Sequence, residues 1–243
     1  MSKISLLSVV IPAYNEAPRI GKTIRTVVEY LQRQPHRWEI LVVNDGSKDD
    51  IEVQIRSFTQ GIPQLRLIQH RINQGKGAAV CSGLKAAQGD AVLFSDADGA
   101  TPIEELEKLL PHLGKGIGMV VGSRRAKGSR VLLEQHWPRR MMSNTYQWIC
   151  RLLVNPGVAD VTCGFKLLTR EMAQLCGSRM RIRRWSFDAE MFTIAKIHEL
   201  KVIEIPIRWF DQRKTKVRLL RDIWGSFWEL IRIRLYTAQG VYR

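Results

Sequence analysis

The apolar positions in the first half of the chain form short runs that alternate with segments of helical spacing. The runs have the length of strands, and between them apolar residues recur every three or four positions. We expect strands at residues 7–11, 38–43, 65–68, 91–94 and 119–121. We expect helices at residues 16–33, 48–59, 75–88 and 102–113. This alternation predicts an α/β fold in which right-handed crossovers build a mainly parallel sheet with helices on both faces.

The second half has a less regular pattern. Residues 124–140 are rich in Arg, Lys and Gly without a steady period, which predicts a mobile basic loop. The later expected elements are a helix at 141–154, a strand with a glycine bend at 161–168, a helix at 186–200, a strand at 202–209 and a closing helix at 219–235. No repeat, low-complexity tract or linker divides the sequence, so we expect one domain over residues 1–243.

The composition is that of a globular protein with an excess of positive charge. Apolar residues make up 45% and charged residues 25% of the 243 positions, which excludes a collagen-like or wholly disordered chain. Lys and Arg number 38 against 23 Asp and Glu, so the formal net charge is +15. This excess predicts an anionic partner, and nucleic acid, an anionic membrane surface and a phosphorylated substrate all satisfy it.

The same composition bears on the compartment. The longest stretch without Asp, Glu, Lys or Arg covers residues 4–15, which is too short to span a bilayer, and the N-terminus lacks the pattern of a signal peptide. The four cysteines show neither CxxC spacing nor a Cys/His metal pattern. We therefore expect free thiols in a reducing cytosol.

The residues that follow each expected strand carry the functional signal, because ligands of parallel α/β sheets bind at the carboxyl ends of the strands. The first strand is followed by PAYNE at 12–16 and the second by NDGS at 44–47. Asp45 stands where its carboxylate could accept a hydrogen bond from an NH or hydroxyl group of a ligand. A turn with a helix N-cap is the alternative interpretation of both motifs.

Two acidic residues, Asp96 and Asp98, follow the fourth expected strand. Carboxylates at this spacing repel each other unless a cation is present, and hard oxygen ligands suit Mg²⁺ or Mn²⁺, which would bridge to a diphosphate. A solvated acidic turn is the alternative. After the third strand, the glycines of NQGKG let the backbone approach a ligand, and Lys76 can pair with a phosphate. Neither the P-loop spacing nor GxGxxG occurs, which disfavours an ATPase and a dinucleotide oxidoreductase.

Together and in this order, the four motifs resemble those of the family-2 inverting glycosyltransferases of the GT-A fold. Four further motifs, VGSR at 121–124, PRRMMS at 138–143, DVTCGFK at 160–166 and RWSFDAE at 184–190, resemble the polyprenyl-phosphate branch and most of all the dolichyl-phosphate β-glucosyltransferases. The resemblance covers nearly the whole chain. It implies a single Rossmann-like GT-A domain with a mixed, mainly parallel sheet. Residues 1–122 would form the nucleotide-sugar half, and residues 123–243 the acceptor half with an amphipathic C-terminal helix.

The resemblance and the motif chemistry together give the candidate site. The nucleotide-sugar site would be lined by Pro12, Ala13, Tyr14, Glu16, Asp45, Gly75, Lys76, Asp96, Ala97 and Asp98. The acceptor phosphate would be bound by Arg124, Arg139, Ser143 and Lys166. The catalytic residues would be Asp96, Asp98, Arg124 and Asp188, with the metal on Asp96 and Asp98. Some mannosyltransferase relatives have a Gln ligand where Ala100 stands here, so water or Thr101 would complete the coordination.

The predicted chemistry joins two anions. A lipid phosphate is ionised at neutral pH, so it can attack the sugar C1 without a strong base, and catalysis would come from cations that hold both anions in line. Arg124, Arg139 and Lys166 would act on the acceptor, and Lys76 with the metal on the leaving diphosphate. Asp188 would act as a base, orient the acceptor or cap its helix.

We therefore expect a metal-dependent inverting transferase that moves glucose from UDP-glucose to a polyprenyl phosphate at the cytosolic face of a membrane. Mannosyl transfer from GDP-mannose, a polysaccharide or soluble acceptor, and the choice between Mg²⁺ and Mn²⁺ stay open. A basic nucleic-acid-binding module is the alternative of a different class, disfavoured because no nucleic-acid motif is recognisable. Trp, Met and Leu beside Arg in residues 137–154 and 219–235 predict peripheral contact with an anionic membrane, with core-facing stripes as the alternative.

Overall fold

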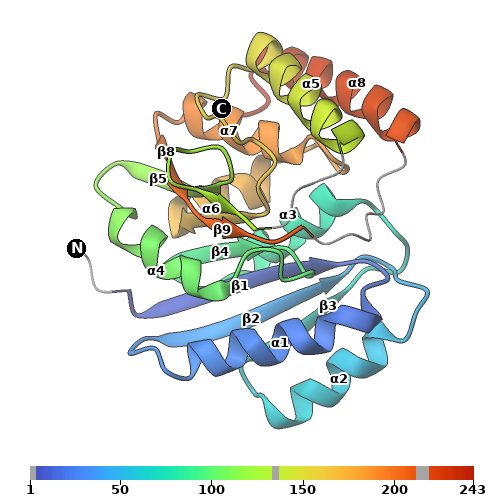
Figure 1. Cartoon of the computed structure of the whole chain (residues 1–243), viewed down its shortest axis with the longest axis vertical. Helices are drawn as coiled ribbons and strands as arrows, with labels where there is room; N and C mark the ends of the chain where they lie inside the picture. The colour runs from blue at the N-terminus through green and yellow to red at the C-terminus, as the bar shows by residue number, and fades with distance from the viewer. Residues whose placement is uncertain (1–3, 133–136, 212–218) are drawn as a thin grey trace.

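The computed structural model describes residues 4–132, 137–211 and 219–243, and the side chains of residues 137–140 and 219–223 are outside that description. Its centre is a seven-stranded sheet in the order β3-β2-β1-β4-β7-β5-β8 (Figure 1). The strands of this sheet are β1 (Leu6–Ala13), β2 (Arg37–Asn44), β3 (Leu65–Gln69), β4 (Ala91–Ser95), β5 (Ile117–Ser123), β7 (Phe165–Thr169) and β8 (Lys201–Pro206). Two short strands, β6 (Arg130–Val131) and β9 (Arg208–Trp209), form a separate parallel pair.

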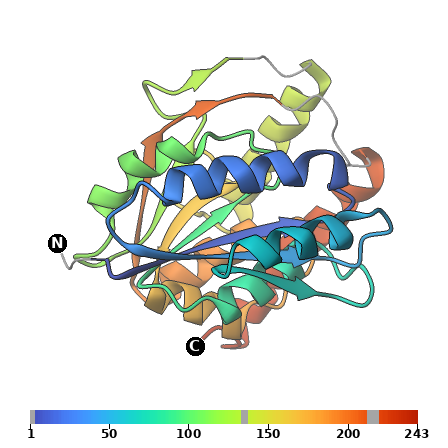
Figure 2. The same cartoon turned by 90° about the horizontal axis from the view of Figure 1, so that it is seen from below.

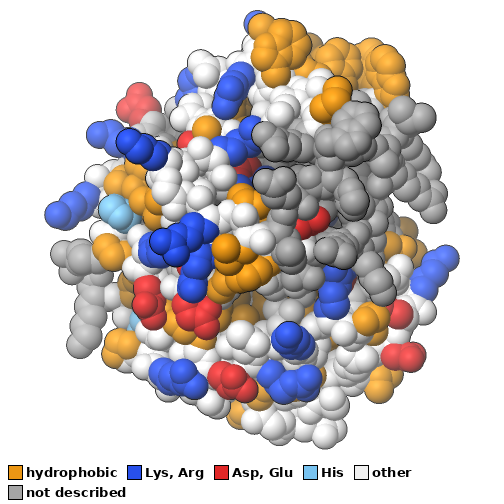
Figure 3. Space-filling view, viewed as in Figure 1, with side chains coloured by type: hydrophobic (Ala, Val, Ile, Leu, Met, Phe, Trp, Pro, Cys, Tyr) orange, Lys and Arg blue, Asp and Glu red, His pale blue; other side chains and the backbone are white. Residues whose placement is uncertain are grey.

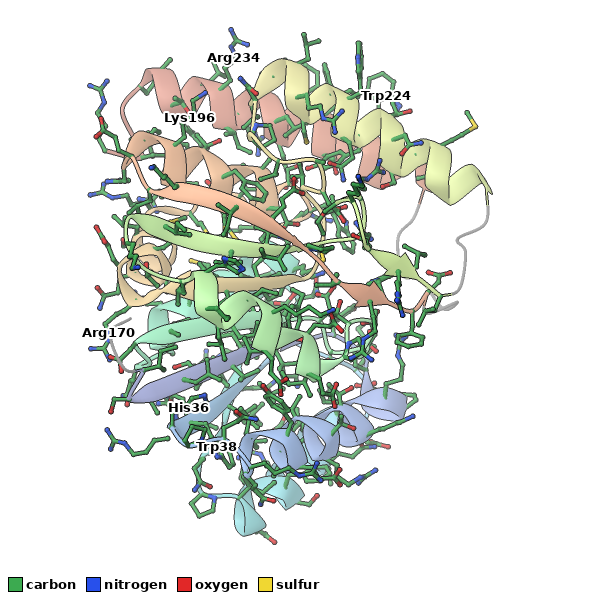
Figure 4. The ribbon with its side chains drawn as sticks, turned by 60° about the vertical axis from the view of Figure 1, so that its left-hand side comes forward. His36, Trp38, Arg170, Lys196, Trp224 and Arg234 are labelled. Atoms are coloured by element: carbon green, nitrogen blue, oxygen red, sulfur yellow. The ribbon has the colours of Figure 1, made fainter. Side chains whose placement is uncertain are left out.

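Helices lie on both sides of the sheet, as the alternating pattern predicts. The helices are α1 (Ala17–Leu31), α2 (Ile51–Gly61), α3 (Lys76–Ala86), α4 (Leu106–Leu109), α5 (Trp137–Leu153), α6 (Arg170–Arg179), α7 (Phe187–Ile197) and α8 (Leu219–Ala238). Helix α1 lies on one side of the sheet, and α3, α6 and α7 lie on the other (Figure 2). Helices α5 and α8 pack side by side at one end of the molecule, and Trp224 and Arg234 both lie along this end (Figure 4).

The central strands are apolar on both faces because helices cover both faces. In β1 and β2, every residue from Leu7 to Ala13 and from Ile40 to Asn44 is buried. Strands buried on both sides form nearly continuous apolar runs instead of alternating with polar residues. This is why the first half of the sequence shows such runs.

The antiparallel strand β7 decides which parts of the chain reach the site. It lies between β4 and β5 and runs antiparallel to both, so that Ser95 at the end of β4 pairs with Phe165 at the start of β7. The segment before β7, residues 158–164, is therefore brought to the edge of the sheet where β1, β2 and β4 end.

The structure confirms the α/β fold, the mainly parallel mixed sheet and the five expected strands of the first half. The expected helix at 102–113 was wrong as one element: α4 is flanked by the 3₁₀ turns Ile103–Glu105 and Leu110–His112. Pro111 lies in the second of these turns and has no amide hydrogen for a continuous helix. The expected strand at 202–209 divides after Pro206, and β9 leaves the large sheet to pair with β6.

Three further differences lie in the second half. Helix α6 was not among the expected elements. Its last turn contains Gly177, a residue of low helix propensity. A Cβ at Gly177 would lie 2.9 Å from the backbone of Lys85 on α3, so close helix packing requires the glycine. The expected basic loop at 124–140 contains β6 and the first residues of α5, with residues 133–136 outside the described set. Strand β7 begins at Phe165 rather than at residue 161.

Candidate active site

Strands β1, β2 and β4 end at one edge of the sheet, and the segments that follow them meet there. The amide of Asp45 donates to the carbonyl of Ala13 at 2.9 Å, which joins the ends of β1 and β2. The hydroxyl of Thr23 on α1 donates to the carbonyl of Ala97 at 2.8 Å, which ties the loop after β4 to α1. Three motifs that are separate in the sequence therefore form one edge.

The segment after β1 forms one rim of this edge. Pro12 and Ala13 are buried, and Tyr14 and Glu16 are half-buried. The carboxylate of Glu16 accepts a hydrogen bond from Nε of Arg19 at 2.8 Å. These positions suit the wall of a nucleoside pocket, and that role stays a prediction.

The carboxylate of Asp45 is buried and holds the loop after β3. Its Oδ1 lies 2.7 Å from Nδ1 of His70 and accepts from the amide of Gln74 at 2.9 Å. Its Oδ2 accepts from Nδ2 of Asn73 at 2.9 Å and from the amide of Gly75 at 2.8 Å. Asp45 thus fixes the NQGKG loop against the end of β2, and Gly75, whose φ is 106°, takes a conformation that suits glycine.

Asp96 and Lys76 face each other across the site. Nζ of Lys76 lies 2.7 Å from Oδ1 of Asp96, and both side chains are about one third exposed, at 30% and 31%. The ammonium also lies 5.7 Å from the ring centre of Phe94 and 5.9 Å from that of Phe187. These rings and the carboxylate give the lysine a defined position at the opening of the site.

Asp98 forms the second half of the acidic pair. Its Oδ1 accepts from the amide of Ala100 at 3.0 Å. Burial raises the pKa of Asp98, and the neighbouring charge of Asp96 raises this pKa further. Within residues 4–132, 137–211 and 219–243, no group of three or more His, Cys, Asp or Glu could hold a metal ion. The acidic pair supplies two hard oxygen donors, so a divalent cation there would take its other ligands from a bound molecule or from water, and that role stays a prediction.

Gly164 leaves the room that Asp96 occupies. The amide of Asp96 donates to the carbonyl of Gly164 at 3.0 Å. A Cβ at Gly164 would lie 1.9 Å from Oδ2 of Asp96 and 2.3 Å from its Cγ. Gly164 belongs to the motif DVTCGFK, but the sequence alone does not place it in the site, because its effect depends on the pairing of β4 with β7.

Lys166 and Asp188 form a buried pair beneath this edge. Nζ of Lys166 contacts Oδ1 of Asp188 and the carbonyl of Cys163, each at 2.5 Å, and Lys166 is fully buried. Burial raises the pKa of Asp188, although the charge of Lys166 opposes the rise. The expected contact of Lys166 with an acceptor phosphate does not match this geometry, since the ammonium is enclosed and already paired.

Arg124 is held by a second buried carboxylate. Its Nε and Nη2 donate to the two oxygens of Asp160 at 2.8 and 2.7 Å, and Nη2 also donates to Thr162. Nε2 of Gln147 on α5 lies 3.4 Å from Oδ1 of Asp160, and Oε1 of the same side chain accepts a hydrogen bond from the amide of Val161. The pKa of Asp160 is lowered because Arg124 outweighs the effect of burial, which alone would raise it. Arg124 is therefore fixed, with its guanidinium centre 5.3 Å from the ring centre of Trp209.

Arg125, which was not among the expected site residues, lies beside the expected acceptor residue Ser143. Nη2 of Arg125 lies 3.3 Å from Oγ of Ser143 and 2.7 Å from Oδ1 of Asn144. Arg125 joins β5 to α5 at the surface, where the expected residue Ser143 also lies. Its position next to Arg124 in the sequence was the available signal. The side chain of Arg139 lies outside the described residues.

In the parts of the chain that the structure describes, every helix is either too short or too polar to cross a bilayer.

Comparisons with known proteins assign the family. Residues 8–176 match the family model described as Glycosyl transferase family 2. Dolichyl-phosphate beta-glucosyltransferase ALG5C of Trichomonas vaginalis is 34% identical over 96% of this chain and 72% of its own length. The human dolichyl-phosphate beta-glucosyltransferase is 31% identical over 98% of this chain and 77% of its own length.

Solved structures agree on the fold. Glucosyl-3-phosphoglycerate synthase of Mycobacterium tuberculosis, in complex with Mn²⁺, UDP-glucose and phosphoglyceric acid, superposes with a TM-score of 0.69 at 20% identity and covers 95% of this chain and 79% of that one. Mannosyl-3-phosphoglycerate synthase of Rubrobacter xylanophilus gives a TM-score of 0.69 at 20% identity, with coverages of 97% and 75%. At this identity the likeness concerns the fold alone. With its family match and its relatives, the chain belongs to glycosyl transferase family 2 and is related to the dolichyl-phosphate beta-glucosyltransferases.

Proposed function

We propose that this glycosyltransferase moves a glucosyl group from UDP-glucose to dolichyl phosphate or a similar polyprenyl phosphate, with inversion at the sugar C1. The observation that carries the proposal is the acidic pair Asp96 and Asp98 at the edge where β1, β2 and β4 end, in a chain whose relatives are named for this reaction over nearly its full length. The choice of glucose rests on those relatives.

Asp96 and Asp98 would hold a divalent cation, Mg²⁺ or Mn²⁺. Two neighbouring carboxylates, one with a raised pKa, favour a positive charge between them. When bound, such a cation would neutralise the diphosphate of the donor and assist its departure. A solved structure of the same fold contains Mn²⁺ and UDP-glucose, and the proposal carries that pair of ligands over to this chain.

Lys76 would stabilise the leaving diphosphate. Its ammonium lies beside Asp96 and is partly exposed, so it can remain near that carboxylate while it faces a second anion. The residues Pro12, Ala13, Tyr14, Glu16 and Asp45 would build the nucleoside wall. Within this wall, Asp45 acts by fixing the NQGKG loop, because both of its oxygens already accept hydrogen bonds from that loop.

The acceptor would approach from the side of α5. Its phosphate is a nucleophile that needs no deprotonation, so the chain has to supply orientation and positive charge. Arg125 and Ser143 lie together at the surface and would contact this phosphate. Arg124 would add its charge from a position fixed by Asp160, and Arg139 stays a candidate. Asp188 and Lys166 would have a structural role, as a buried ion pair that holds the segment before β7 in place beneath the site.

The end of the molecule formed by α5 and α8 would contact the membrane. Hydrophobic side chains gather at this end (Figure 3). Five of them are at least 60% exposed: Met141, Trp148, Leu152, Trp224 and Trp228. Exposed arginines on the same helices, Arg151, Arg232 and Arg234, would pair with anionic headgroups. Apolar side chains bordered by cations are typical of helices that lie in a membrane interface. Four free cysteines support a location on the cytosolic side.

A transfer assay tests the proposal. The protein is incubated with radiolabelled UDP-glucose, dolichyl phosphate and Mn²⁺ or Mg²⁺, and label is counted in the organic phase, with and without a chelator. We expect label in the organic phase that the chelator abolishes and added metal restores. If label were transferred from GDP-mannose instead, the transferred sugar would be mannose. If labelled product stayed in the aqueous phase, the acceptor would be a soluble molecule rather than a lipid phosphate. No transfer from any common sugar nucleotide would refute the reaction class.

A further inference from the structure

Tyr242 occupies an interior position that the proposed reaction does not use. The segment after α8 folds back and buries this side chain completely. Its hydroxyl donates to Oε1 of Glu190 on α7 at 2.7 Å, and its carbonyl lies 2.8 Å from Nε2 of His198. The ring packs edge-on against Tyr236 with the centres 6.2 Å apart. A buried phenol on a buried carboxylate is a strong, directional contact.

Glu190 connects Tyr242 to the loop that precedes α7. Its Oε1 accepts from the amide of Arg181 at 2.7 Å, and its Oε2 accepts from the amide of Ile182 at 3.0 Å. Glu190 is fully buried, and these three donors leave neither oxygen free. Without the hydroxyl of Tyr242, Oε1 would keep only the amide of Arg181 as a donor, so the buried carboxylate would be held less firmly.

The same loop, residues 181–184, is hydrogen-bonded to the N-terminus of α3. The carbonyls of Arg183 and Arg184 accept from the amides of Ala78 and Gly77, each at 3.0 Å. A Cβ at Gly77 would lie 2.5 Å from the neighbouring carbonyl of residue 182, so the two backbones are in direct contact. These bonds satisfy two amides that the first turn of a helix leaves without partners. Residue 76, between the N-cap glycine and Gly77, is the lysine that faces Asp96.

We propose that Tyr242 and Glu190 are positioning residues for the donor diphosphate site. They fix the backbone of residues 181–184, that backbone fixes the first turn of α3, and the first turn places Lys76 against Asp96. The carboxylate of Glu190 binds the amides of residues 181 and 182, and the carbonyls of residues 183 and 184 bind the first turn of α3. A displacement at Tyr242 therefore reaches the backbone from which the side chain of Lys76 extends to Asp96. The identity of the ligand, a nucleoside diphosphate, rests on the proposed function, whereas the chain of contacts does not.

The test compares Tyr242→Phe with Tyr236→Phe. The first variant removes only the oxygen that binds Glu190 and keeps the ring. The control removes the hydroxyl of the neighbouring ring, which makes no hydrogen bond within the described part of the chain. Hydrogen–deuterium exchange is followed in peptides that contain Gly77 and Ala78, with β2 as an internal reference.

We expect Tyr242→Phe to speed exchange in the 77–78 peptide roughly tenfold, with β2 unchanged and Tyr236→Phe like wild type. Glu190→Gln should have a larger effect, because its amide nitrogen would face the amide of Ile182. In parallel, Tyr242→Phe should weaken binding of UDP with Mn²⁺ several-fold and raise the KM for the donor, while the KM for dolichyl phosphate stays the same.

Two results would overturn the proposal. One is exchange in the 77–78 peptide equal to wild type in both Tyr242→Phe and Glu190→Gln. The other is faster exchange in β2 to the same degree, which would mean general loosening. The exchange measurement uses no donor. It therefore tests the contacts between Tyr242 and the first turn of α3 even if the wild-type protein does not bind UDP. A wild type that binds no UDP would instead count against the proposed function.

Discussion

Gly164→Ala tests whether the space beside Asp96 is essential to the site. The added Cβ would lie 1.9 Å from Oδ2 of Asp96, whereas ordinary contact begins near 3.4 Å. The carboxylate would therefore have to retreat by about 1.5 Å, or the β4–β7 pairing would have to open. The φ of Gly164 is outside the left-handed region, so the backbone itself accepts alanine. Any loss of activity or stability in Gly164→Ala should therefore come from the contact of the new methyl group with Asp96.

A displacement of this size is large for a catalytic group. A misplacement of about 1 Å can cost roughly 10²-fold in rate, which corresponds to about 2.7 kcal/mol in the activation free energy. We expect Gly164→Ala to lose at least that factor in kcat/KM for transfer to dolichyl phosphate. It should also destabilise the fold by about 1–3 kcal/mol through overpacking, measured by urea unfolding.

A double-mutant cycle identifies the cause. In an Asp96→Ala background the carboxylate is gone, so the added methyl group should cost little stability, and the two substitutions should be strongly non-additive. Gly61→Ala is the matched control, because a Cβ there meets nothing within 4 Å. Activity of Gly164→Ala within twofold of wild type, or an equal stability loss in both backgrounds, would show that contact with Asp96 is not the cause.

Three further predictions concern the metal, the buried ion pair and the membrane. Asp98→Ala should abolish nearly all transfer, and near-normal turnover in the radiolabel assay would overturn the metal assignment. Asp160→Asn should lower the free energy of unfolding at pH 7 by about 3–5 kcal/mol, because Arg124 is left buried without its partner. The pKa of Asp160 is lowered in the folded state, so its stabilisation is present above the ordinary value of 3.8 and is lost as the pH falls. The difference between variant and wild type in urea unfolding should shrink below that pH, and a constant difference would contradict this. Replacement by serine of the exposed tryptophans Trp148, Trp224 and Trp228 should reduce co-sedimentation with anionic vesicles at least tenfold without changing the melting temperature, and unchanged sedimentation would exclude α5 and α8 as the contact.

The local pattern of side chains was sufficient for much of the fold and for the donor edge. The apolar runs of β1, β2 and β4 reflect burial on both faces, which neighbouring residues encode directly. The acidic pair Asp96 and Asp98 could be placed because ligand sites of parallel sheets lie just after strands, and that rule needs only the strand positions. Helix α6 could not be placed in this way. The glycine at position 177 is required by close contact with α3, which neighbouring residues do not encode.

The pairing and burial of the charged side chains could be learned only from the folded chain. Three cations lie in or beside the motifs and look equivalent in the sequence. In the fold, Lys166 is buried beneath the sheet edge and paired with Asp188, whereas Arg124 is bound by Asp160. The third, Arg125, lies at the surface. These outcomes depend on β7 running antiparallel between β4 and β5, which brings residues 158–166 to a site formed by other strands. The strands, their ends and the acidic pair could be predicted without the fold, since these follow from side chains within one segment. The cost of burying a charge depends on every segment packed around it, so the roles of the individual cations were decided only when the chain folded.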